Sequence, residues 1–161
     1  SAKAFRLMWE TGLLEDLLPD LAHYVTRSGG AKSPEWKYLE VLDEYEKMMA
    51  EKGFEVSNGL RAAVLMTGLA RIDKKNGSGR RVMQKMFDAL HVPKATYFLG
   101  SLLIESRVRL SVSPTKGKTR FVHNRDFLDA LDYNRIVFRA EGRDESGLNE
   151  WSDLYEEKGN K

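Results

Sequence analysis

The spacing of the apolar residues constrains the fold of this 161-residue chain more than any other feature. From residue 4 to residue 155 these residues recur at steps of three and four, which is the repeat of an amphipathic helix. No segment combines strict two-residue alternation with turn residues at both ends, as a half-buried strand would. We therefore predict an all-α fold, an irregular bundle of seven or eight helices with no sheet.

Prolines and glycines set the helix boundaries. Gly12 is expected to close a first helix over residues 3–11, because glycine adopts the left-handed conformation without strain. Pro19 should divide the next leucine-rich stretch into a turn and a helix. The remaining helices are expected to start at Pro34, at Ser57 or Asn58, after Gly79, at Pro93, at residue 124 and at Ser146.

Simple counts exclude several classes of protein. The chain has no cysteine, which rules out a disulfide framework, a zinc–thiolate site and a cysteine nucleophile. This composition is compatible with a reducing compartment, and we expect a cytoplasmic location. No apolar run approaches the roughly 20 residues that cross a membrane, so no membrane partner is expected. The first residues are Ser1 and Ala2, from which we expect a fragment of a longer protein.

The net charge of +2 conceals a strong segregation of charge. Residues 1–70 carry a net charge of −3, residues 71–125 carry +10, and residues 126–161 carry −5. We accordingly divide the chain into an acidic part, 1–70, and a part over 71–161 that contains the basic stretch 71–125. Both are expected to belong to one compact helical unit.

The basic stretch supplies the candidate binding residues. Closely spaced cations suit the phosphate backbone of a nucleic acid, because binding releases the counterions of the phosphates. The alternative is that these charges are solvated or pair with the acidic flanks. The candidate RNA-binding residues are Lys74, Lys75, Arg80, Arg81, Lys85, Lys94, Arg107, Arg109, Lys116, Lys118, Arg120 and Arg125.

Motifs for catalysis are missing from the sequence. The three histidines, His23, His91 and His123, have no partner at metal-ligand spacing, and no G-x-S-x-G motif occurs. Residues 77–79 lack the spacing of a phosphate-binding loop, and the acidic stretches 43–46 and 126–132 fall on predicted amphipathic helices. We therefore predict no catalytic residue, no metal ligand and no cofactor in this chain.

Four stretches together resemble a known family. They are residues 4–21 with a Gly-Leu-Leu turn and Leu-Pro-x-Leu, the segment His91 to Lys94, the segment His123 to Glu141 ending in Arg-Ala-Glu, and Trp151 with Leu154. This pattern resembles the carboxy-terminal part of bacterial poly(A) polymerases, class II nucleotidyltransferases related to the CCA-adding enzymes. Two departures are Asn124, where the family pattern has proline, and the lack of an arginine-rich tail.

The resemblance implies a role in RNA polyadenylation and mRNA processing. Residues 1–70 would be neck and body helices, and residues 71–161 would be the RNA-binding body and tail. A catalytic head outside this chain would use ATP and Mg²⁺, so this chain alone is expected to be inactive. The implied partners are RNA, that head domain, and an RNA helicase or RNase. Lys94 is the candidate that the charge and the resemblance both support.

Other interpretations stay open from the sequence. The chain could be the equivalent region of a CCA-adding tRNA nucleotidyltransferase. It could also be a protein-interaction module that docks a helicase, a nuclease or the catalytic head through exposed Trp36 and Trp151. Tyr97 and Phe121 are candidates for stacking on RNA bases, although burial in the core is the alternative for both. Arg139 and Glu141 are expected to form a structural ion pair.

Overall fold

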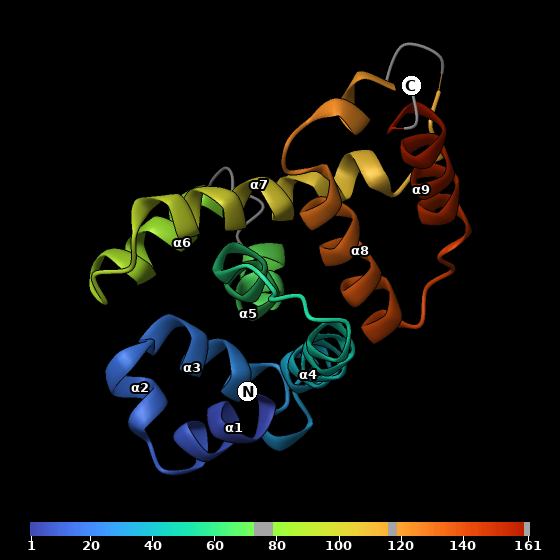
Figure 1. Ribbon diagram of the computed structural model, residues 1–161. Coiled ribbons are helices and arrows are strands. Elements are labelled where there is room, and N and C mark those ends of the chain that lie inside the picture. The colour runs from blue at the N-terminus through green and yellow to red at the C-terminus, as the bar shows by residue number, and fades with distance from the viewer. Residues whose placement is uncertain (73–78, 116–118, 160–161) are drawn as a thin grey trace.

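The computed structural model describes residues 1–72, 79–115 and 119–159, and within these ranges it contains only helices and their connections (Figure 1). The predicted all-α fold is confirmed for this described part. Its helices are α1 (Ala2–Glu10), α2 (Leu13–Leu17), α3 (Pro19–Arg27), α4 (Glu35–Glu51), α5 (Asn58–Ile72), α6 (Gly79–Asp88), α7 (Lys94–Leu110), α8 (Phe127–Glu141) and α9 (Ser146–Gly159), with 3₁₀ turns η1 (Gly30–Lys32) and η3 (Thr119–His123).

The helix count differs from the prediction at α2. Gly12 has the expected left-handed conformation, with φ of 81°, and Pro19 is the first residue of α3. Between them, however, the predicted turn is a short helix, in which the amide of Leu18 donates to the carbonyl of Leu14 at 2.8 Å. The described part therefore has nine α-helices instead of seven or eight.

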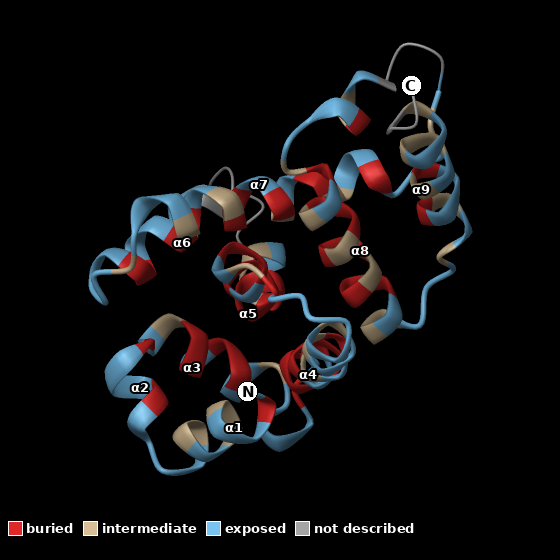
Figure 2. Ribbon diagram, in the orientation of Figure 1, coloured by how far each residue is buried: buried red, intermediate tan, exposed pale blue. Residues whose placement is uncertain are grey.

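Helix α5 lies at the centre of the molecule (Figure 1). It packs against α3, α4, α7 and α8, and Figure 2 shows it buried over most of its length. The buried residues run on consecutive positions from Ala62 to Gly68, so this helix is buried on all sides. An α-helix that is apolar on every face is typical of a core helix.

Glycines allow the closest helix contacts. A Cβ at Gly59 would lie 2.6–2.7 Å from Leu99 on α7, and a Cβ at Gly68 would lie 2.3 Å from the hydroxyl of Tyr24 on α3. Real Cβ contacts are not this short, so a side chain at either position would force Leu99 or Tyr24 to shift. The glycines of α5 thus set its distance from two neighbouring helices.

Both tryptophans proposed as exposed docking residues are buried, so that expectation is wrong. Trp36 is 3% exposed and donates its indole N–H to the carbonyl of Gly30 at 2.9 Å. Trp151 is fully buried and donates to the carbonyl of Val112 at 2.8 Å. A buried indole with its donor satisfied is a core residue, and neither ring is available to a partner.

Glu141 connects four helices through its carboxylate. Tyr38 of α4 donates its hydroxyl to Glu141 at 2.7 Å, and Arg71 of α5 lies 2.6 Å away. Arg107 of α7 donates to both carboxylate oxygens at 2.6 and 2.8 Å. Burial raises the pKa of Glu141, but Tyr38 and Arg107 outweigh it, and the pKa is lowered. Arg139 pairs with Glu145 at 3.3 Å, so the predicted Arg139–Glu141 pair is wrong in its partners.

Across the described ranges, none of the helices combines the length and the apolar composition needed to span a bilayer.

Candidate nucleic-acid interface

The structure divides the predicted RNA-binding cations into three groups. Lys74, Lys75, Lys116 and Lys118 lie outside the described residues, as does the side chain of Arg80. Arg107 is half-buried within the protein, with 17% of its side chain exposed. The cations that the structure places at the surface are Arg81, Lys85, Lys94, Arg109, Arg120 and Arg125.

Arg107 is held inside the protein by Glu141, so its guanidinium is not available to a phosphate. One guanidinium nitrogen of Arg107 donates to both carboxylate oxygens of Glu141, and hydrogen bonds between two charged groups are stronger than those between neutral groups. The assignment of Arg107 as an RNA-binding residue is therefore corrected, because the residue has a structural role. The sequence pattern could not separate it from Arg109, two positions further along the same helix.

The first surface group lies on α6 and at the start of α7. No described carboxylate forms an ion pair with Arg81 or Lys94. Lys85 lies 3.1 Å from Asp20, with 76% and 42% of the two side chains exposed. Ion pairs this exposed contribute little to stability, so Lys85 can exchange Asp20 for a phosphate at small cost.

The second surface group lies at the end of α7 and around η3. Arg109 places its guanidinium 4.6 Å from the ring centre of Phe121. Arg120 is exposed, and no described carboxylate is within ion-pair distance of either arginine. Arg125 is 94% exposed and lies 3.4 Å from Asp126. This group combines cations with a partly accessible aromatic ring, whereas Tyr97, the other stacking candidate, is buried at 3% exposure.

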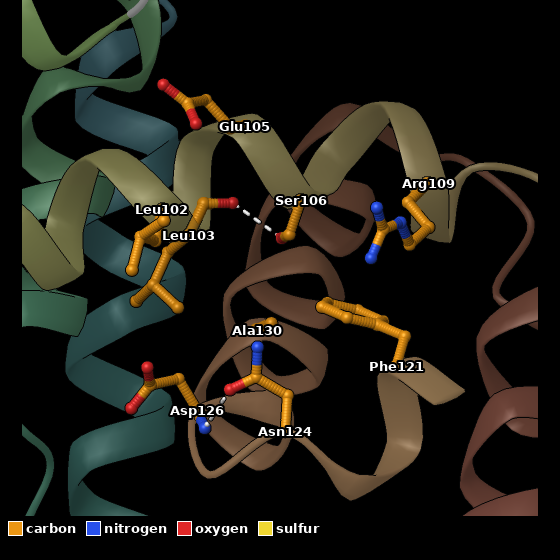
Figure 3. A pocket seen from close by; sticks show the side chains of 9 residues that line it. All are labelled: Leu102, Leu103, Glu105, Ser106, Arg109, Phe121, Asn124, Asp126 and Ala130. Carbon is orange, nitrogen blue, oxygen red and sulfur yellow. Dashed lines mark hydrogen bonds between the residues drawn. The ribbon is translucent and has the colours of Figure 1, made fainter. Parts of the chain in front are cut away.

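A pocket of about 210 Å³ opens between α7, η3 and the start of α8 (Figure 3). Phe121 forms one wall and is held by edge-on contacts with Phe127 and Trp151, at ring-centre distances of 5.5 and 6.2 Å. Asn124 is oriented by the amide of Asp126, which donates to its side-chain oxygen at 3.1 Å. The full lining is Leu102, Leu103, Glu105, Ser106, Arg109, Phe121, Asn124, Asp126 and Ala130.

Sequence reasoning missed this pocket. Glu105 and Arg109 come from α7, whereas Asn124 and Asp126 come from the segment before α8, and only the tertiary packing brings the two parts together. The one local signal available was Phe121, an aromatic residue within the basic stretch.

Histidine and carboxylate side chains are spread over the part of the chain that the structure describes. No three histidine or carboxylate side chains gather there in an arrangement that could hold a metal ion. Asp43, in one acidic stretch, accepts bonds from the amino-terminal group of Ser1. Asp129, in the other, accepts from Ser57 at 2.9 Å. Comparisons with protein-family models, curated proteins and solved structures found no match to this chain.

Proposed function

We propose that this chain binds single-stranded RNA through the exposed cations of α6, α7 and η3. We further propose that it is the non-catalytic, RNA-holding part of a poly(A) polymerase. Such a protein would hold the 3′ segment of an RNA while a catalytic head elsewhere in the polypeptide adds AMP from ATP with Mg²⁺. The equivalent region of a CCA-adding enzyme is the nearest alternative.

The placement of the cations is the observation that carries the proposal. Of the seven predicted cations whose side chains are described, six are exposed and only Arg107 is used to hold the helices together. Their elements α6, α7 and η3 follow one another along the upper edge of the molecule in Figure 1. Side chains in such positions can contact phosphates of a strand that runs along this edge.

The shortage of opposing charge supports the same function. Residues 71–125 contain 13 Lys or Arg and only three acidic residues, Asp73, Asp88 and Glu105. A charged ligand responds to the local patch, because screening at about 0.1 M salt acts over about 10 Å. The net charge of the whole chain therefore does not prevent binding of a polyanion.

Sequence resemblance supports the narrower assignment. The stretches 4–21 and 123–141 resemble poly(A) polymerases, and helices α1–α3 and α8 form where those stretches lie. The absence of cysteine suits a reducing cytoplasm, which we keep as the proposed compartment. The alternative, a protein-docking function, depended on Trp36 and Trp151 being exposed, and both are buried.

Charge reversal at three exposed positions tests the RNA-binding function. The triple variant R81E/K94E/R120E should lower the affinity for an unstructured 15-nucleotide RNA by about tenfold or more, since three phosphate contacts are replaced by repulsion. Fluorescence anisotropy at low salt measures the affinity. Circular dichroism should show an unchanged helical signal, because the three side chains are exposed.

The matched control reverses three exposed lysines of the acidic part, as K3E/K37E/K52E. It changes the net charge by the same amount but leaves α6, α7 and η3 intact, and we expect it to lose much less affinity. Equal losses in both variants would show that only the total charge matters and would contradict the proposed interface.

A further inference from the structure

We propose that the pocket between α7 and η3 receives one RNA base that carries an exocyclic amino group, as adenine, cytosine and guanine do. This inference rests on the RNA-binding function proposed above and names the part of the ligand that enters the protein. The strand would keep its phosphates outside, on the surrounding cations.

A stacking platform lies at one side of the pocket (Figure 3). The guanidinium of Arg109 lies over the ring of Phe121, and Arg109 is exposed to solvent. Bases of single-stranded RNA stack on aromatic rings and on the plane of arginine side chains. Because Phe127 and Trp151 fix the ring of Phe121, the platform is formed before a ligand arrives.

The size of the pocket fits a single base. Sites for drug-sized ligands have volumes of about 300–1,000 Å³, and this pocket is smaller, at about 210 Å³. Leu102, Leu103 and Ala130 supply apolar surface, which suits the flat faces of a base.

The polar lining selects the kind of base. Asp126 brings a carboxylate to the pocket, which repels a phosphate and accepts a hydrogen bond from an amino group. Cytosine, adenine and guanine each present such an amino group, and uracil does not. The only ring N–H that uracil offers lies between two carbonyl oxygens, and a carboxylate repels both. Negative charge inside the pocket thus disfavours the phosphate backbone of the RNA and favours a base that carries an amino group.

Cations flank the same pocket. Arg120 precedes Phe121 in the chain, Arg125 follows Asn124, and both are exposed. They are placed to contact phosphates on the two sides of an inserted base. Phosphate contacts position a strand without reading its sequence, whereas contacts to the base edge give the preference.

Two pyrimidine oligonucleotides provide the test, because they differ in the amino group and not in ring size. The chain of residues 1–161 should bind the RNA C15 about fivefold or more tightly than U15, as measured by anisotropy at one low salt concentration. The D126N variant keeps the size of the side chain but replaces the carboxylate that accepts the amino group. Its affinity for C15 should fall towards that for U15, while its affinity for U15 stays the same. The matched control R120K should keep the preference.

Three results would overturn the proposal, and they separate it from the proposed function. If C15 and U15 bind with equal affinity and the binding is sensitive to salt, the base pocket is refuted but the RNA-binding function is not. A preference for C15 that persists in full in D126N shows that the base is read elsewhere. No binding of either RNA overturns both the pocket and the proposed function.

Discussion

Glu35 is a carboxyl group buried in the core without an ion-pair partner among the described residues. It is 1% exposed, and neither of its side-chain oxygens has a hydrogen-bond partner among the described residues. Burial raises the pKa of Glu35 well above its usual range, and the nearby backbone of Gly68 offsets only part of that rise. The protonated form is therefore the one that the folded protein accommodates.

Because Glu35 is buried, its ionisation makes the free energy of unfolding depend on pH. Above the pKa of the unfolded carboxyl, folding must keep a proton that the unfolded chain has released, so wild-type stability falls as pH rises towards the folded pKa. The slope from this group is at most about 1.4 kcal/mol per pH unit. Glu35→Gln removes the ionisation, and its melting temperature should gain about 2–5 °C relative to wild type between pH 5 and pH 7.

The control for this prediction is Glu40→Gln on the same helix, where the carboxylate is exposed. Its melting temperature should follow that of the wild-type protein across the pH range. A Glu35→Gln protein whose melting curve keeps the wild-type pH dependence would show that Glu35 is not buried in this way.

At the scale of the elements, the contact between α5 and α7 depends on Gly59. A Cβ added at this glycine would meet three atoms of Leu99, among them the Leu99 Cβ itself, which cannot move without its backbone. Gly59→Ala should therefore push the two helices apart and lower the free energy of unfolding by about 1–3 kcal/mol, as measured by chemical denaturation.

Gly147→Ala is the matched substitution in α9. A Cβ there meets no atom within 4 Å, and alanine favours a helix over glycine by about 0.5–1 kcal/mol. This variant should be as stable as wild type or slightly more stable. If Gly59→Ala behaved in the same way, the close packing of α5 against α7 would be refuted.

The ends of helices could be predicted from the sequence where the backbone preference of a single residue sets them. Gly12, Pro19 and Pro93 mark helix boundaries because their backbone preferences act within one or two residues. The short helix α2 was missed because five residues between two such signals contain too little pattern. The burial of Trp36 and Trp151 was also missed, because helical spacing shows that residues share a face but not how fully neighbouring helices cover it.

At the scale of the whole molecule, the basic stretch of the sequence supplies exposed cations on elements that follow one another in the chain. Six of the described cations of residues 71–125 lie exposed on α6, on α7, on η3 or just after η3, whereas Arg71 of α5 and Arg107 of α7 pair with Glu141. The sequence could predict which residues are basic. It could not predict that Glu141, 34 positions away, removes Arg107 from the surface, or that Phe121 and Arg109 meet beside a pocket.

The salt dependence of RNA binding tests the central claim most directly. The affinity of residues 1–161 for an unstructured RNA should be measured by anisotropy from 50 to 200 mM salt. If three or more phosphates contact the cations of α6, α7 and η3, log K should fall linearly against log salt with a slope of about −2 or steeper. Absence of binding at 50 mM salt, or a slope near zero, would contradict the account.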